Sequence, residues 1–201
     1  RGEAEAARRG MTIVPPFDHI NTAAGQGTIG LEILEQRPDV TRVYVPIGGG
    51  GLISGVAAAI KLSRPSIEVV GVEPTGTARM TASLRAGHPV TIPITPGIAD
   101  GLLAVRPGDI TFRHVQAFVD RIVTIDDRAI VAALQWIFRA ARIVSEPSGA
   151  ITVAAALAER ASASLAPRGA AVAVISGGNV EPLSFTEYLT CDLATLRLAA
   201  T

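Results

Sequence analysis

The amino-acid sequence predicts an α/β fold, in which helices cover both faces of an open, mostly parallel sheet to give a three-layer αβα arrangement. Segments rich in β-branched residues alternate with segments of helical periodicity, the pattern of βαβ units. Glycine-containing turns follow or adjoin apolar segments, as expected where parallel strands end. A hydrophobic content of 48% over 201 residues is sufficient for a large packed core.

The first half of the chain predicts two helices, a strand and then a βαβ unit. Residues 1–10 are charged and rich in alanine, which indicates the end of a helix. Residues 11–14 predict a strand that runs into a loop at Pro15. The spacing of apolar residues then predicts helix 27–37, strand 42–47, helix 52–62 and strand 67–72. The last three elements form a βαβ unit, so its two strands are expected to be parallel.

The second half of the chain repeats this alternation around a long loop. Gly87 ends a helix predicted at residues 77–85, and Asp126 or Asp127 is expected to cap the helix that extends to Arg142. The other predicted elements are a proline-rich loop at 89–107, a strand at 119–125, a helix at 150–165 and a buried strand at 170–175.

Composition and charge limit the partners and the compartment. Basic and acidic side chains number 18 each, so no net field attracts nucleic acid or an anionic membrane. No apolar run approaches the roughly 20 residues that span a bilayer. With one cysteine, Cys191, and no signal-peptide pattern, we expect a cytoplasmic protein.

The chain shows no repeat and no internal linker, so one main domain is expected at residues 13–190. Residues 1–12 are expected to be the end of a preceding amino-terminal region, and residues 191–201 a carboxyl-terminal tail. Arg1 as the first residue suggests a chain cut from a longer one. An interdomain surface and a sheet edge would then be exposed, which favours a homo-oligomer.

Four consecutive glycines at residues 48–51 are the strongest functional signal. They lie between a β-branched strand and an alanine-rich helix, where backbone N–H groups and the helix dipole can bind a phosphate. Two further glycine-containing turns are predicted at residues 25–27 and 176–179. All three are expected to converge at the carboxyl ends of the strands.

Two nucleotide-binding alternatives compete for the same glycines. Gly49-x-Gly51-x-x-Ser54 approximates a dinucleotide-binding fingerprint, and Glu73 falls where an acid that binds a ribose would lie. The third fingerprint position is Ser54, however, and the fingerprint gives no role to residues 176–179. A P-loop is excluded because no Gly-Lys-Ser or Gly-Lys-Thr follows the glycines.

A series of short motifs, all in one order over about residues 13–181, carries a family resemblance. They are Pro16-Phe17-Asp18, Ala24-Gly25-Gln26-Gly27-Thr28-Ile29-Gly30-Leu31-Glu32-Ile33, Val45-Pro46-Ile47-Gly48-Gly49-Gly50-Gly51-Leu52, Gly71-Val72-Glu73-Pro74, Ile98-Ala99-Asp100-Gly101, Glu146-Pro147-Ser148-Gly149-Ala150 and Ser176-Gly177-Gly178-Asn179-Val180. With these motifs the chain resembles the pyridoxal-phosphate threonine dehydratases, whose close kin are serine dehydratases and serine racemases.

The resemblance implies the large domain of the type II pyridoxal-phosphate fold, with pyridoxal 5'-phosphate as cofactor. It implies that Ser176 meets the pyridine nitrogen, with Gly177 beside it. Glu146 is implied to lie near the ring, although as a residue that precedes a helix it can equally be a partner of the helix dipole. The cofactor phosphate is implied to be held by Gly48, Gly49, Gly50, Gly51 and Leu52.

The implied reaction is α,β-elimination of water from a small hydroxy amino acid, threonine or serine, to give a 2-oxo acid and ammonia. The lysine that forms the Schiff base in this family lies in a Ser-Phe-Lys motif that the chain lacks. Of its 18 basic residues only Lys61 is a lysine, about 15 Å along a helix from Gly51, and we interpret it as a solvated side chain. No catalytic residue is therefore assigned within the chain.

Three alternatives remain open: a serine racemase-like enzyme, a non-catalytic remnant of the fold, and an NAD-binding domain. In metal-activated racemases of this family a second acid accompanies the residue that corresponds to Glu73. Arg79 stands about where that acid would be, so no metal site is expected.

Overall fold

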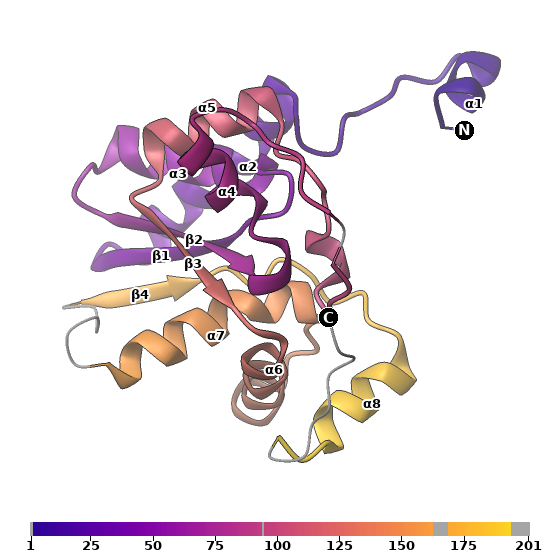
Figure 1. Cartoon of the computed structure of the whole chain (residues 1–201). Helices are drawn as coiled ribbons and strands as arrows, with labels where there is room; N and C mark the ends of the chain where they lie inside the picture. Colours follow the sequence, from indigo (N-terminus) through magenta and orange to yellow (C-terminus); the bar gives the residue numbers. More distant parts are fainter. Residues whose placement is uncertain (1, 94, 163–168, 194–201) are drawn as a thin grey trace.

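A computed structural model describes residues 2–93, 95–162 and 169–193 of the chain. In this part a single sheet has the strand order β3-β2-β1-β4, and every pairing is parallel, as the sequence predicts (Figure 1). Val43 on β1 pairs with Val69 on β2 and with Val172 on β4. The strands are β1 (Val40–Pro46), β2 (Glu68–Pro74), β3 (Arg121–Ile125) and β4 (Ala170–Ala173).

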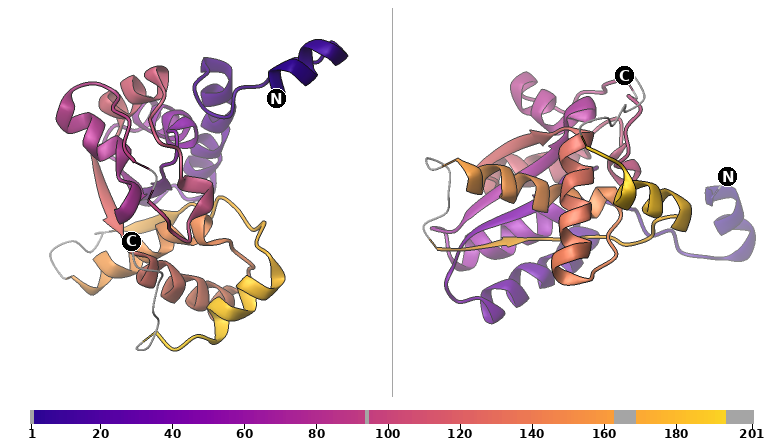
Figure 2. Two further views of the ribbon diagram at one scale, coloured as in Figure 1. Left: turned by 45° about the vertical axis from the view of Figure 1, so that its right-hand side comes forward. Right: turned by 90° about the horizontal axis from the view of Figure 1, so that it is seen from below.

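Helices cover both faces of this sheet and complete the three layers. α2 to α5 lie on one face, and α6 and α7 lie on the other (Figures 1 and 2). The helices are α1 (Gly2–Arg9), α2 (Ile20–Gln36), α3 (Gly51–Ser63), α4 (Arg79–Ala86), α5 (Asp109–Phe118), α6 (Asp127–Ala141), α7 (Pro147–Ala161) and α8 (Pro182–Thr190), with short 3-10 turns η1 (Thr75–Thr77) and η2 (Asp100–Leu102). None of these described helices combines the length and apolar character that a bilayer crossing requires.

The core divides between the two faces because successive strand residues point in opposite directions. On β1, Val43 and Val45 pack with α3 and α5, whereas Tyr44 between them packs with α6 and α7. Val69 and Val70 on β2 divide in the same way. Burial on both faces explains why these strands are continuous apolar runs.

The amino ends of the strands carry a network of paired charges. Arg121 on β3 donates to Glu159 on α7 at 2.6 Å and to Glu68 on β2 at 2.6 Å. Arg42 on β1 also contacts both carboxylates, and the Tyr44 hydroxyl donates to Glu159 at 2.8 Å. Burial opposes ionisation of Glu159, but the hydrogen bonds from Arg121 and Tyr44 outweigh it and hold the pKa of Glu159 below its ordinary value.

The strand predicted at residues 11–14 is wrong. This segment has no regular secondary structure, and the Val14 side chain is 76% exposed. It joins α1, which lies away from the sheet, to the body of the molecule (Figure 1). Met11, Ile13 and Val14 gave a strand pattern, but within the described part of the chain no strand pairs with this segment.

The glycine turn predicted at residues 25–27 is also wrong, because α2 begins at Ile20 rather than at Gly27 and includes these residues. The small residues instead allow α2 to pack closely on α3. A Cβ atom on Gly30 would lie 2.9 Å from the Val56 carbonyl oxygen, and one on Gly55 would lie 2.0 Å from the Ala23 carbonyl oxygen. Glycine here serves helix packing and not a turn.

Several boundaries differ from the prediction. α5 and α8 were not predicted, and β4 is half-exposed rather than buried because it is the edge strand of the sheet. α7 spans Pro147–Ala161, and residues 163–165 of the helix predicted at 150–165 lie outside the described residues. Two predicted helix boundaries are confirmed: the Asp126 carboxylate caps the start of α6, and Gly87 ends α4 with φ +76°.

Candidate functional site

The glycine loop, defined here as residues 48–51, connects the carboxyl end of β1 to the first turn of α3. Gly50 has φ +98°, a left-handed conformation that favours glycine. It precedes α3 as the N-cap residue, and no side-chain hydrogen bond caps the helix. The first N–H groups of a helix have no partner within the helix, and they carry the positive end of its dipole. The start of α3 is thus available to an anion.

The neighbouring start of α5 shows what a filled site looks like in the same molecule. The Asp18 carboxylate accepts hydrogen bonds from the N–H groups of Asp109 at 3.0 Å, Ile110 at 2.9 Å and Thr111 at 3.3 Å. Gly108 permits this approach, since a Cβ atom there would lie 2.2 Å from an Asp18 oxygen. An internal carboxylate therefore occupies the start of α5, whereas α3 begins after Gly50, which has no side chain that could cap the helix.

Two carbonyl groups of the glycine loop are held on the protein side. The Gly49 carbonyl oxygen accepts from the Thr111 hydroxyl at 2.6 Å and from the Gly108 N–H at 3.3 Å. The Gly48 carbonyl oxygen accepts from Nη1 of Arg79 at 3.4 Å. In a trans peptide the N–H points opposite to the C=O, so the N–H groups of Gly49 and Gly50 are directed away from these donors.

Packing also requires glycine in this loop, a reason that the sequence alone did not reveal. A Cβ atom on Gly49 would lie 2.3 Å from the Phe17 ring, and one on Gly51 would lie 2.8 Å from the Phe17 Cα atom. Phe17 thus fills one side of the loop. Leu52, the fifth residue predicted to hold phosphate, is half-buried in the first turn of α3.

The second turn, residues 176–179, follows β4 and is fixed by Glu146. The Asn179 N–H donates to the Glu146 carboxylate at 3.0 Å, and the Glu146 N–H donates to the Gly177 carbonyl oxygen at 3.1 Å. A Cβ atom on Gly177 would lie 2.5 Å from the Glu146 carboxyl carbon. Glu146 precedes α7, but its side chain binds this turn and does not cap the helix. Ser176, at the start of the turn, is exposed.

The two turns lie at the same edge of the sheet because β1 and β4 are adjacent and parallel. The segment around Gly101 connects them. A Cβ atom on Gly48 would lie 3.4 Å from the Gly101 carbonyl oxygen, and the Gly101 N–H donates to the Ser148 hydroxyl at 2.9 Å, two residues beyond Glu146. Of the three glycine turns predicted to converge, these two reach one edge, and residues 25–27 do not.

Glu73 is a buried carboxylate whose hydrogen bonds are all made within the protein. It is fully buried, and its two oxygens accept from the N–H groups of Met80 and Thr81 and from the Thr81 hydroxyl, all within 2.9 Å. Burial raises the pKa of this carboxyl above its usual value, against the lowering effect of these hydrogen bonds. A carboxylate engaged in this way cannot bind a ribose hydroxyl, and with the Arg79 guanidinium nearby the donor set does not fit a divalent cation.

Lys61 lies in the last turn of α3, at the opposite end of the helix from the glycine loop. Its Nζ donates to an Asp120 carboxylate oxygen at 2.7 Å and to the Pro65 carbonyl oxygen at 3.1 Å. The interpretation of Lys61 as a solvated side chain is therefore wrong, since 17% of it is exposed and it forms an ion pair. Lys61 nevertheless lies at the far end of α3 from the glycine loop, as predicted.

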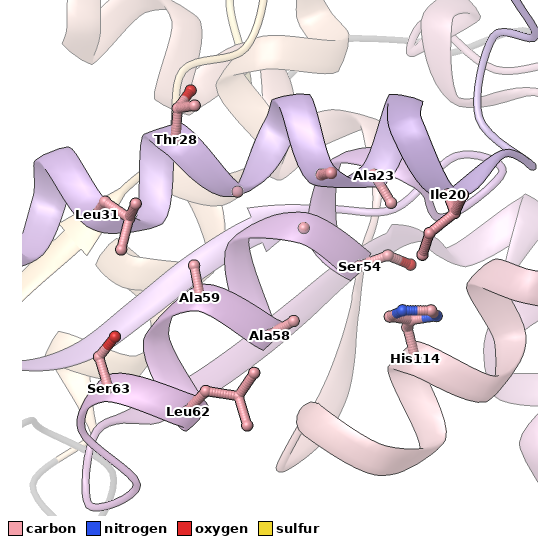
Figure 3. Close-up of a pocket in the computed structure, with 13 residues that line it drawn as sticks. Ile20, Ala23, Thr28, Leu31, Ser54, Ala58, Ala59, Leu62, Ser63 and His114 are labelled. Carbon is pink, nitrogen blue, oxygen red and sulfur yellow. The ribbon is translucent and has the colours of Figure 1, made fainter.

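An apolar groove of about 460 Å³ lies beside this site, between α2 and α3. Figure 3 shows Ile20, Leu31 and Leu62 along it, with His114 of α5 at one end near Ser54. None of the residues that line it carries a formal charge other than the titratable His114. Apart from His114, its polar side chains are the hydroxyl groups of Thr28, Ser54 and Ser63, so the groove offers a phosphate group no fixed positive charge.

Sequence reasoning missed three residues that shape the site. Asp18 caps a helix more than 90 residues away, and Thr111 and Arg79 orient the loop carbonyl groups. Asp18 was noted only as part of a motif, and α5 itself was not predicted. These contacts depend on tertiary structure, so the only sequence signal is the presence of donors and acceptors of the right type.

Comparison with known proteins identifies the family. The model of the family described as pyridoxal-phosphate dependent enzyme matches residues 1–177. A biosynthetic L-threonine dehydratase of Salmonella typhimurium is 46% identical over 176 residues, which cover 87% of this chain and 34% of that protein. A serine racemase of Oryza sativa subsp. indica is 44% identical over 174 residues, which cover 86% of this chain and 51% of that protein.

The fold is shared with solved members of this group. The processed form of threonine deaminase isoform 2 from Solanum lycopersicum superposes with a TM-score of 0.88 at 36% identity, over 96% of this chain and 56% of that one. The strand order alone is common to dinucleotide-binding sheets and does not decide between the two. The family match decides, and the chain, which spans about a third to a half of the curated relatives it matches, belongs to the pyridoxal-phosphate dependent enzyme family.

Proposed function

We propose that this chain binds pyridoxal 5'-phosphate and that the glycine loop holds the cofactor phosphate. The observation that carries the proposal is the uncapped start of α3, beside an α5 whose start is filled by Asp18. An anion at α3 would receive what Asp18 receives at α5, namely several N–H hydrogen bonds and the favourable end of a helix dipole. The proposed phosphate-binding residues are Gly48, Gly49, Gly50, Gly51 and Leu52.

The turn after β4 is proposed to bind the cofactor ring. Ser176 offers a neutral hydroxyl for the ring nitrogen, Gly177 lets the backbone approach, and Glu146 positions both through the turn that it holds. When bound, pyridoxal phosphate supplies an electron sink for negative charge at the substrate Cα. A serine hydroxyl, unlike a carboxylate, does not hold a proton on the ring nitrogen, which favours prompt expulsion of a β-hydroxyl over a long-lived carbanion.

We propose that the protein to which this chain contributes is an ammonia-lyase for threonine or serine. The threonine dehydratase and threonine deaminase relatives support this activity. The Cα–H and Cβ–OH bonds of the substrate break, water leaves, and hydrolysis of the resulting enamine gives a 2-oxo acid and ammonia. Lys61 is committed to Asp120, so the Schiff-base lysine is proposed to come from a region outside residues 1–201. The serine racemase relative supports racemisation as the second candidate.

We further propose that residues 13–190 form the cofactor-binding domain. Residues 1–12 would then be the end of a preceding region and residues 191–201 a tail, of which residues 194–201 lie outside the described part of the chain. α1 lies away from the sheet, as expected for the end of another region (Figure 1). Limited proteolysis tests these boundaries: cleavage between α1 and α2 should leave the rest of the chain folded, and unfolding on cleavage there would contradict the proposal.

Self-association through the α2–α3 groove is proposed on the basis of its exposed apolar side chains. Ile20, Leu31 and Leu62 are each more than half exposed along one continuous groove. Analytical ultracentrifugation should detect a dimer or higher oligomer that Leu31→Lys disrupts. A wild-type chain that sediments as a monomer would contradict this proposal.

We propose a cytoplasmic location, because the free thiol of Cys191 has no cysteine partner in the chain and the fold needs no disulfide. Fractionation of source cells, followed by detection with an antibody, tests the location. Recovery outside the cytoplasmic fraction would contradict it.

Calorimetric titration of the chain tests the cofactor assignment. Pyridoxal 5'-phosphate should bind and NAD should not, and Lys61→Arg should bind as well as the wild type because Lys61 lies far from the loop. Borohydride reduction of the K61R complex should attach no cofactor covalently to a side chain, because this variant has no lysine. NAD binding in place of pyridoxal phosphate, or loss of binding in K61R, would overturn the assignment.

A further inference from the structure

Arg79 is a buried cation without a full set of partners. Its side chain has no solvent exposure, and Nε and Nη2 find no hydrogen-bond partner among the described residues. Burying a guanidinium group without hydrogen-bond partners costs free energy of folding unless another interaction offsets that cost. Arg79 starts α4, directly after the 3-10 turn that follows β2.

Glu73 carries the opposite charge nearby, but its carboxylate accepts its hydrogen bonds from other residues. The Glu73 oxygens accept from Met80 and Thr81 instead, and the influence of Glu73 on Arg79 is Coulombic. The hydrogen bond that the guanidinium does make runs from Nη1 to the Gly48 carbonyl oxygen at 3.4 Å. The cation is therefore directed at the first residue of the glycine loop.

We propose that Arg79 is a positioning residue for the phosphate, a role that rests on the proposed function of the glycine loop. Its hydrogen bond holds the Gly48–Gly49 peptide so that the Gly49 N–H faces the ligand side. Its positive charge lies behind the loop and favours a doubly charged anion in front of it. Arg79 thus acts through the loop and does not touch the reacting atoms.

The contribution of Arg79 is specific to the phosphate, which separates it from a purely structural role. Pyridoxal lacks the phosphate but retains the ring, so the ratio of the pyridoxal Kd to the pyridoxal phosphate Kd isolates the part that Arg79 should influence. A residue that only stabilises the fold would change both constants together or neither. The matched control is Arg85→Met, since Arg85 lies on the same helix and is exposed.

We expect Arg79→Met to lower this ratio by about tenfold, the size of one charge-assisted hydrogen bond, and R85M to leave it unchanged. Glu73→Gln should act in the opposite direction and raise the ratio severalfold, because it removes the opposing charge. Its amide oxygen can still accept from Met80, and its amide nitrogen can donate to the Thr81 hydroxyl in place of the hydrogen bonds that the carboxylate accepts from Thr81. This second variant keeps the test decisive if R79M does not fold.

The outcomes distinguish the two proposals. A wild-type chain that does not prefer pyridoxal phosphate over pyridoxal would overturn the proposed function of the loop. A wild-type preference that persists in folded R79M would overturn the role of Arg79 alone. An unchanged ratio in E73Q would do the same, whether or not R79M can be measured.

Discussion

The two edges of the sheet differ in how their polar groups are satisfied. At the amino edge, Arg42, Arg121, Glu68 and Glu159 pair with one another across three strands and a helix. At the carboxyl edge, glycine turns leave N–H groups without a side-chain acceptor at the start of α3. One edge is complete within the protein, and the other is the edge at which we propose that a ligand binds.

This difference separates stability from function along the same strands. Charges that are paired inside the protein can stabilise the fold but cannot attract a ligand, whereas unsatisfied N–H groups cost stability until an anion binds. Substitutions at the amino edge should therefore change the free energy of unfolding and leave ligand preference intact. Substitutions at the carboxyl edge should change ligand preference by more than stability alone explains.

The largest effect on stability is expected from Glu159→Ala at the amino edge. It removes the buried carboxylate that accepts from Arg121 and Arg42, which costs about 3 kcal/mol, the low end for breaking a buried pair because Glu68 still pairs with both arginines. Urea unfolding measures this loss, with Glu35→Ala on the exposed surface of α2 as control. The folded fraction of E159A should keep the wild-type preference for pyridoxal phosphate over pyridoxal. A loss of that preference would show that the two edges are not independent.

Gly50→Ala should have the next largest effect on stability and abolish the preference for the phosphate. Its φ of +98° strains any other residue, and the added Cβ would lie 2.9 Å from Thr111, at a cost of about 1–3 kcal/mol. Gly87→Ala is the matched control, since Gly87 also has a positive φ but open space around it. Titration with both ligands should show the loss in G50A only, and an equal loss in G87A would refute a local role for the loop.

Thr111→Val removes the 2.6 Å hydrogen bond to the Gly49 carbonyl and leaves the Gly49–Gly50 peptide held only by the 3.3 Å hydrogen bond from the Gly108 N–H. We expect a stability loss of about 1 kcal/mol together with weaker binding of pyridoxal phosphate. Thr152→Val removes a similar buried hydroxyl, which donates to the Val174 carbonyl at 2.8 Å, and should leave the phosphate preference unchanged. If both variants bind the phosphate equally well, Thr111 does not orient the loop.

The smallest expected effect is a pH dependence that belongs to the amino edge. Because the pKa of Glu159 is lowered in the folded protein, its contribution to stability is complete above the unfolded pKa of a glutamate. That contribution is lost as the pH falls through the lower, folded pKa. Urea unfolding between pH 7 and acid pH should show a steeper decline for wild type than for Glu159→Gln. Parallel declines would contradict the assignment.

The sequence predicted the parts of the fold that local pattern determines. β1, α3 and β2 were recognisable because apolar runs and glycine punctuation agree with their burial in the structure. The strand at residues 11–14 failed because a strand needs a partner, and α2 was predicted too short because its glycines pack against α3. Local sequence does not contain either fact.

The sequence predicted the backbone turns of the candidate site but not the side chains that hold these turns in place. The glycine loop and the turn at residues 176–179 follow strands, so their shared edge could be expected. Asp18, Thr111 and Arg79 act across large separations in the chain, and no short motif indicates which N–H or carbonyl group each one meets. Their roles required the three-dimensional arrangement.

A crystal structure of the chain with pyridoxal 5'-phosphate tests the central claim most directly. We expect phosphate oxygens within about 3.5 Å of backbone nitrogens among residues 49–52, with Asp18 still bound at the start of α5. A phosphate bound elsewhere, with the start of α3 left empty, would contradict it.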